Sequence, residues 1–348
     1  MSEKQLPDKH QITLTESGPA PSDRRSKKAA LKNHCKRFWW LHLIIFLVVT
    51  AAVICIVIFV GVKNIAQSKI NSADLDIQSI NILDTKSDRF LMQINSTIRT
   101  DGTVKADIDP FVGNLTLLDV PNARPFIQLP FPMTNANKFQ TVNISQQVTI
   151  TDEEAFEEYN INFFQKETIR VGIHGTTQVQ PAGLSKKYDV DFYKVAELKG
   201  LNKLNGTTLS DMKIKIGIAE NGIPNFNATA TIINRSYYTI DLGNATFDNY
   251  ADGQLLGNLT IQNLVLKPGP NVVPVSAMLD QALVITIATK KPYCEDRKLP
   301  IQLLGTDVKK GSETIPWLLA ALRSANQTVE LGLEDTFKAA GLSFPGCS

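Results

Sequence analysis

Histidine and cysteine, two residue types that could carry out catalysis, are scarce in the long part of the chain that follows residue 62. His174 is the one histidine there, so a Ser-His-Asp triad would have to use it. It lies in an alternating apolar segment, which favours a packed or strand-edge histidine over a catalytic base. Cys294 and Cys347 are the two cysteines of this part, and we expect them to pair with each other rather than bind zinc.

Carboxylates are plentiful, but no spacing in the sequence singles out a catalytic or metal-binding set. Five acids cluster within residues 152–158. Thr151 and Glu154 have the form of a capping box, so these acids are better explained as the solvated first turns of a helix than as a cation site. No Gly-rich phosphate loop is present. We therefore predict no enzymatic activity, no catalytic residue, no bound metal and no cofactor.

The sequence contains many asparagines that could carry N-linked glycans. All nine Asn-X-Ser/Thr acceptors, where X is not proline, lie after residue 62. They are Asn95, Asn114, Asn143, Asn205, Asn227, Asn234, Asn244, Asn258 and Asn326. Their excess on one side of the chain indicates that residues 63–348 enter the secretory pathway.

The element that would position these acceptors is the apolar run 38–62, which holds no Asp, Glu, Lys or Arg. A helix rises about 1.5 Å per residue, so this run is long enough to cross a hydrocarbon core of about 30 Å. It is too long for the apolar region of a cleaved signal peptide. We predict an uncleaved signal-anchor, that is, a single transmembrane helix.

Charge beside this run sets the predicted orientation. Residues 24–37 contain seven Lys or Arg and no acid, which marks the cytosolic flank. We therefore expect a type II protein, with residues 1–37 a disordered basic tail in the cytosol and residues 63–348 in the lumen. The expected location is the vacuole or another endomembrane, with the plasma membrane as an alternative.

Partners follow from the same charge distribution. The basic tail would meet the lipid bilayer at anionic cytosolic lipids, although setting topology alone would also account for it. Cys35 in the tail is either an acylation site or an unmodified thiol. After residue 62 acids slightly outnumber Lys and Arg and no basic patch stands out, so we expect no nucleic acid partner.

From residue 73 onward the apolar residues alternate with polar ones in short runs that are separated by turns. This density of strands predicts a mainly β fold of tandem antiparallel β-sandwiches, in domains 63–200 and 201–348. One or two helices are expected, near residues 151–163 and 314–323. A further strand is predicted from the alternation of Leu283, Ile285 and Ile287. A Cys294–Cys347 disulfide would tie the C-terminal segment back.

Several turn and bend motifs carry a resemblance to a known family. They are Asn225–Thr229, Ile233–Ser236, Ile240–Gly243, Leu256-Gly257 and Lys267–Asn271. With Ile214 to Ile218, they resemble a LEA-2 (late embryogenesis abundant, type 2) sandwich. Residues 70–290 are similar to a fungal family of membrane-anchored proteins with a domain of unknown function. The resemblance implies fibronectin-III-like sandwiches on the lumenal side of a fungal vacuolar membrane or another endomembrane. Some related LEA-2 proteins hold lipid in an apolar groove.

Two functions are consistent with these observations. The first is a non-enzymatic lumenal module that binds protein or lipid, with a role in vacuolar regulation. The second is a membrane-tethered hydrolase acting on lumenal glycans. An apolar groove between the sheets would favour the first function, whereas two carboxylates about 5 to 9 Å apart in an open cleft would favour the second.

Overall fold

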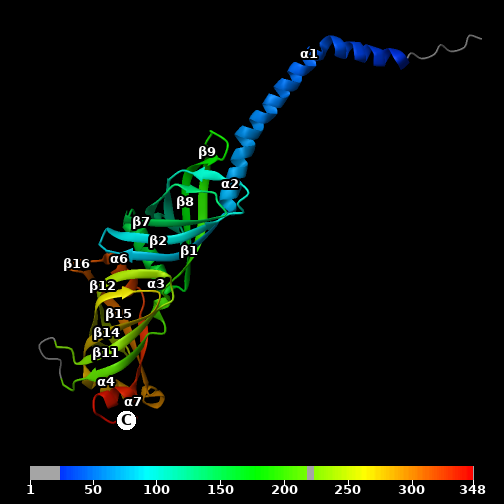
Figure 1. Cartoon of the computed structure of the whole chain (residues 1–348). Helices are drawn as coiled ribbons and strands as arrows, with labels where there is room; N and C mark the ends of the chain where they lie inside the picture. Colours follow the sequence, from blue (N-terminus) through cyan, green and yellow to red (C-terminus); the bar gives the residue numbers. More distant parts are fainter. Residues whose placement is uncertain (1–23, 218–222, 348) are drawn as a thin grey trace, which may run out of the picture. The chain divides into compact units, whose positions relative to one another are not determined.

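The computed structural model describes residues 24–217 and 223–347, with side chains from residue 38 onward, as two compact units that divide after Val62. The first unit contains the helix α1 (Arg24–Ile56) and the π-helical turn η1 (Val57–Gly61). Phe38 has non-helical backbone angles, and α1 bends there (Figure 1). The bend coincides with the predicted start of the membrane segment.

One helical stretch in the described chain, Phe38–Ser72, is long and apolar enough to cross a membrane. None of the side chains in its most apolar window is buried against protein. The helix starts at Arg24, within residues 1–37 that were predicted to form a disordered tail. Residues 1–23 and the side chain of Cys35 lie outside the described part, and the predictions made for them stay predictions.

The second unit is mainly β, as predicted, and is built on two sheets. The larger sheet contains eleven strands. In chain order they are β1 (Asp74–Leu83), β2 (Arg89–Arg99), β7 (Phe139–Thr149), β10 (Thr208–Ile214), β11 (Phe226–Asn234), β12 (Tyr238–Ala251), β13 (Gln254–Leu266), β14 (Gly269–Leu279), β15 (Lys298–Lys310), β16 (Glu313–Thr314) and β17 (Gln327–Gly332).

The smaller sheet contains six strands. All of them belong to the part of the unit that runs from β1 to β9, which we call the first half, and the remaining part is the second half. They are β3 (Ala106–Ile108), β4 (Phe111–Leu117), β5 (Pro125–Phe131), β6 (Thr134–Asn135), β8 (Thr168–Pro181) and β9 (Tyr188–Lys199). The helical elements are α2 (Val62–Ser72), α3 (Glu153–Gln165), η2 (Asn202–Leu204), α4 (Gln281–Ala288), α5 (Tyr293–Asp296), α6 (Pro316–Arg323) and α7 (Leu333–Ala339). This is more helix than the one or two segments predicted.

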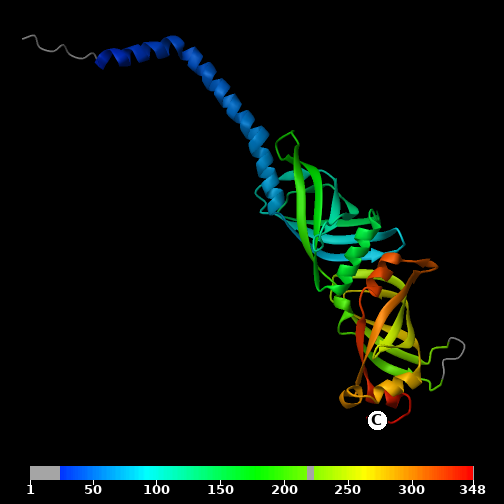
Figure 2. The same ribbon diagram turned by 180° about the vertical axis from the view of Figure 1, so that it is seen from behind.

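In the first half, strands β1, β2 and β7 of the large sheet face the small sheet. Their alternate side chains point inward, as in Phe90 and Met92 of β2, and meet Val171 and Ile173 of β8 in one core. The two facing layers form the first of the predicted sandwiches. Helix α3 lies at the end of this core and packs against α6 (Figure 2).

Strand β12 joins the two halves. Its first residues pair in parallel with β1, through Ile80 opposite Tyr238, and its later residues pair antiparallel with β15, through Leu303 opposite Asn249. Strand β13 runs along its other edge. Because both halves share this strand and a continuous core, residues 63–348 form one compact unit without a break at the predicted boundary of 200 and 201.

The second half is a single sheet that curls around its own core. From one edge to the other, the strands of this sheet follow the order β10, β11, β14, β13, β12, β15 and β17. The last strand, β17, contacts the first, β10, so the sheet closes on itself. The layers that face each other here therefore belong to one sheet. Strand β12 is antiparallel to every partner except β1.

Two helices differ from the sequence prediction, and in each of them an aspartate side chain caps the N-terminus. The helix near residue 151 is capped by Asp152 instead of Thr151, and the Asp152 carboxylate accepts a hydrogen bond of 3.0 Å from the Ala155 amide. Residues 281–288 form helix α4 and not the predicted strand, because Asp280 caps the Leu283 amide at 3.0 Å. The apolar residues there are spaced ambiguously between the two structures.

The turn after β9 explains why Gly200 is suited to its position. A Cβ atom there would lie 2.3 Å from the Lys166 carbonyl oxygen and 2.6 Å from that of Phe163. The same close approach lets the Leu201 amide donate to the Phe163 carbonyl at 2.8 Å. The turn thereby closes the C-terminal end of α3.

Cys294 and Cys347 form a disulfide, as the sequence predicted, with Cα atoms 5.1 Å apart. The bond ties the end of the described chain to helix α5. Cys55 is a free, exposed cysteine within α1. This agrees with its expected place in the apolar run.

Candidate functional site

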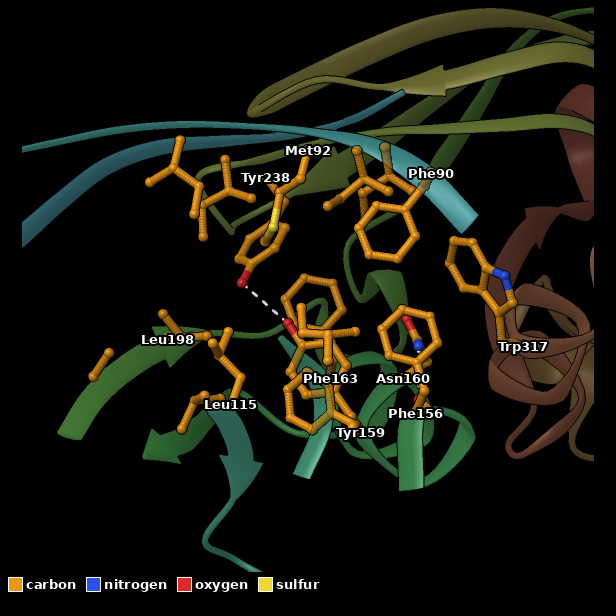
Figure 3. A pocket seen from close by; sticks show the side chains of 18 of the residues that line it. Phe90, Met92, Leu115, Phe156, Tyr159, Asn160, Phe163, Leu198, Tyr238 and Trp317 are labelled. Carbon is orange, nitrogen blue, oxygen red and sulfur yellow. Dashed lines mark hydrogen bonds between the residues drawn. The ribbon is translucent and has the colours of Figure 1, made fainter. Parts of the chain in front are cut away.

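An apolar cavity lies between the two sheets of the first half, and we call it the aromatic cavity (Figure 3). Its space not filled by protein atoms is about 1160 Å³, counting the part open to solvent. Strands β1, β2, β4, β5, β8, β9 and β12 and helices α3 and α6 all contribute to its wall. The wall includes Phe90, Phe126, Phe156, Tyr159, Phe163, Tyr238 and Trp317.

Helix α3 supplies more of the aromatic rings than any other element. Phe156, Tyr159 and Phe163 recur every three or four residues, so they share one helix face, as their spacing predicted. The Tyr159 ring stacks on Phe126 with centroids 4.5 Å apart. Asn160 satisfies its buried amide locally, because its Nδ2 donates to the Phe156 carbonyl at 2.7 Å.

Two buried tyrosines form the main polar feature of this cavity. The hydroxyl oxygens of Tyr159 on α3 and Tyr238 on β12 lie 3.0 Å apart and share a hydrogen bond (Figure 3). Burial raises the pKa of each phenol well above its ordinary value of 10. Both therefore remain neutral hydroxyls at physiological pH. Two hydroxyls carry two hydrogens and this bond uses one, so the pair keeps a second hydrogen to donate.

Trp317 closes the side of the cavity next to α6. Its ring lies 5.0 Å from Phe156 and 5.7 Å from Phe90, between centroids. The indole Nε1 donates to the Lys86 carbonyl at 2.9 Å, so the polar edge of the ring is satisfied outside the apolar space. The sequence placed Trp317 on a helix. It carried no signal that this helix would cover a cavity made by the first half.

No charged side chain lines the aromatic cavity among the described residues. A charged ligand group would lose its hydration here without gaining a counter-ion, so the cavity suits uncharged, apolar groups. Within the part of the chain that the structure describes, no three His, Cys, Asp or Glu side chains gather in a way that could hold a metal ion.

The residues that could have suggested catalysis lie elsewhere. His174 is exposed on β8, with its ring 6.5 Å from that of Tyr193, so it is neither packed nor at a strand edge as expected. Of the acidic cluster, Asp152 and Glu154 pair with Arg124 on the surface. The structure brings neither His174 nor these acids to the cavity.

The structure places the nine predicted glycan acceptors in different environments. Four side chains are exposed: those of Asn95, Asn143, Asn205 and Asn326. Four are half-buried: those of Asn114, Asn227, Asn244 and Asn258. The exposed set lies in open positions on the surface, where an attached glycan would meet solvent.

Asn234 is the exception, and its environment argues against the predicted glycan. It is 1% exposed. Its Nδ2 donates to the Tyr238 carbonyl at 2.8 Å, and its Oδ1 accepts from the Ser236 amide at 2.9 Å. A glycan on Nδ2 would need space that neighbouring protein atoms already fill. Asn234 instead holds the turn between β11 and β12 in shape, as Asx side chains do in tight turns.

Residues 124–249 match the family described as "Protein of unknown function (DUF3712)". This finding agrees with the predicted resemblance insofar as it concerned a domain of unknown function. The matched residues run from β5 to β12, so they cross the predicted boundary at 200 and 201. They include both cavity tyrosines. No curated protein matches the chain.

Three solved structures show a remote likeness to this chain. Red sea bream transglutaminase is 12% identical at a TM-score of 0.24, and the match covers 75% of this chain and 31% of that one. Spo0M, a sporulation control protein from Bacillus subtilis, is 12% identical at a TM-score of 0.20, with 77% and 94% covered. An adhesin from Mobiluncus mulieris is 11% identical at 0.18, with 67% and 80% covered. Likeness at this level indicates neither fold nor function.

Proposed function

We propose that this chain is a type II membrane glycoprotein of the fungal vacuole or a related endomembrane, and that it binds a lipid in the aromatic cavity. The helix from Phe38 serves as the anchor in this proposal, and the basic residues before it stay in the cytosol. The observation that carries the proposal is an uncharged, aromatic-walled space with one buried pair of neutral hydroxyls.

The lining favours an acyl chain over a peptide or a sugar. A glycan would need many hydrogen-bonding groups, and a hydrolase would need a pair of carboxylates. Among the described residues, no Asp or Glu lines the aromatic cavity. The apolar wall would gain from excluding water from a hydrocarbon tail, and the tyrosine pair offers one donor to an ester or hydroxyl group.

The test uses the full chain in membranes that contain phosphatidylcholine with a photoactivatable acyl chain. After irradiation, the labelled peptides are identified by mass spectrometry. The anchor should be labelled in any case, which provides an internal control. We expect additional label in peptides from α3 and β12. Label confined to the anchor would refute lipid binding by the cavity.

Neighbouring residues of β9 provide a matched pair of variants. Ala196 lines the cavity, whereas Val195 is 50% exposed on the opposite face of the strand. Ala196→Phe should fill part of the cavity and remove its label, while Val195→Phe should leave the label unchanged. Thermal unfolding of both variants shows whether the fold is intact.

A further inference from the structure

A second cavity lies inside the curled sheet of the second half, and we call it the Asn249 cavity. Its space is about 980 Å³, counting the part open to solvent. Its wall consists mostly of Leu, Ile, Val, Ala and Phe side chains, and no charged residue contributes to it among the described residues. Both cavities are lined in part by the same four leucines, Leu204, Leu242, Leu266 and Leu322.

Two buried amide side chains interrupt this apolar wall. Asn249 is 2% exposed and Gln327 is 6% exposed. Both occupy inward positions of their strands, where the neighbouring inward residues are apolar. No protein group in the described chain bonds to Nδ2 or Oδ1 of Asn249, nor to Nε2 of Gln327. Such groups are rare in folded proteins because each loses its hydration on burial.

The sheet register brings the two amides into one row. Asn249 of β12 is opposite Leu303 of β15, and Leu303 is opposite Gln327 of β17. Side chains in one row of adjacent strands point to the same face of the sheet. The strands are about 4.8 Å apart, so the backbones of Asn249 and Gln327 are roughly 10 Å apart. Their side chains can reach one small group from two sides.

The unbonded atoms define the chemistry of that group. Asn249 offers one donor atom with two hydrogens and one acceptor atom, and Gln327 offers one donor atom with two hydrogens. A hydroxyl group donates once and accepts twice, so it can give each of these three atoms one hydrogen-bond partner. A carboxylate cannot donate, and it would be buried without a counter-charge.

The remaining wall fits an apolar body attached to this hydroxyl. From Gln327 the inward residues of β17 continue to Val329 and Leu331, roughly 13 Å along the strand. A neighbouring groove shares part of this wall, namely Leu331, Phe226, Leu279 and Val284. The exposed side chains of Ile216 and Ile285 also line this groove. This groove provides an apolar route from the surface.

We infer that the Asn249 cavity is a binding site for a neutral lipid alcohol, whose hydroxyl is bonded by Asn249 and Gln327 and whose hydrocarbon part lies along β17. This site has polar groups of its own, because neither Asn249 nor Gln327 lines the aromatic cavity. The inference therefore does not depend on the proposed function of the first cavity.

The probe is hexadecanol with a photoactivatable group in mid-chain, and its comparison is the matching methyl ether, which accepts a hydrogen bond but cannot donate one. Both are added to membranes that contain the full chain. We expect the alcohol to label β17 peptides about tenfold more efficiently than the ether, as expected for one buried hydrogen bond. Equal labelling by the two probes would overturn the inference. Absence of β17 label would mean that water alone satisfies the amides, and would also overturn it.

Asn249→Leu removes the donor and acceptor while keeping the side chain's approximate size. It should lower β17 labelling by the alcohol about tenfold and abolish the preference over the ether. Because it replaces an unbonded amide by an apolar group, the variant should fold at least as well as the wild type. Gln327→Met serves as a second, independent variant with a smaller expected loss.

Tyr238→Phe alters only the aromatic cavity and should leave β17 labelling unchanged. If the wild-type chain is labelled in β17 but not in α3, the proposed function of the aromatic cavity fails and this inference stands. Unchanged alcohol preference in Asn249→Leu would refute the inference alone.

Discussion

The hydroxyls of Tyr159 and Tyr238 bond to each other at 3.0 Å, 79 residues apart in the chain, where α3 meets the strand shared by both halves. Both side chains are buried. A hydrogen bond in such a place contributes to stability mainly because each partner would otherwise be left unsatisfied.

Removing one partner should therefore cost more than removing both. We expect Tyr238→Phe to lower the free energy of unfolding by about 1 to 3 kcal/mol, because the Tyr159 hydroxyl loses its partner. Adding Tyr159→Phe should recover part of this loss, because no unpaired hydroxyl is then left buried. A double-mutant cycle by denaturant unfolding measures this coupling. Additive losses would show that the two hydroxyls act independently.

Alkaline pH should destabilise the fold through the same pair. Burial raises the pKa of both tyrosines above the value of 10 that they have when unfolded. Their contribution is complete below pH 10. As pH rises from 10 toward the folded pKa values, only the unfolded state loses protons, so stability falls by up to about 1.4 kcal/mol per pH unit for each tyrosine.

The check is unfolding at several pH values between 9 and 12, beside absorbance of the phenolate. In Tyr159→Phe/Tyr238→Phe the alkaline loss of stability should be smaller. If both proteins lose stability equally, the buried pair is not its source.

Glycan mapping should separate the acceptors by their environment. We expect Asn95→Gln, Asn143→Gln, Asn205→Gln and Asn326→Gln each to remove one glycan, since these side chains are exposed. Asn234→Gln should leave the glycan number unchanged and lower stability by about 1 to 3 kcal/mol, because it disrupts buried hydrogen bonds. Intact-protein mass before and after deglycosylation provides the measurement. A glycan found on Asn234 would contradict its buried role.

Loss of the disulfide should weaken the second half. The Cys294–Cys347 bond closes a loop with a separation of 53 residues. By chain entropy, such a crosslink contributes about 4 kcal/mol. Cys294→Ser/Cys347→Ser should show that loss in denaturant unfolding. Cys55→Ser alters a cysteine outside this bond and serves as the control.

Some features could be predicted because they depend on local composition. The apolar run, the alternation of the strands and the aromatic face of α3 are each visible in a short window of residues. Over residues 281–288 the sequence predicts a strand because the apolar residues fit either period, whereas the cap at Asp280 favours the helix α4 that forms. Asn234 has a complete acceptor motif, yet the turn that buries it involves Tyr238.

The amino-acid sequence alone determined an apolar helix that can cross a membrane, a β-rich remainder and a disulfide pair, because composition, alternation and cysteine number are properties of short segments or simple counts. Only the tertiary structure decided the two cavities and the row of Asn249 and Gln327. These depend on strand register and on the parallel pairing of β1 with β12, which joins residues more than 150 positions apart. Such pairings leave no local pattern, because the alternation of apolar and polar residues in a strand does not depend on which strand pairs with it.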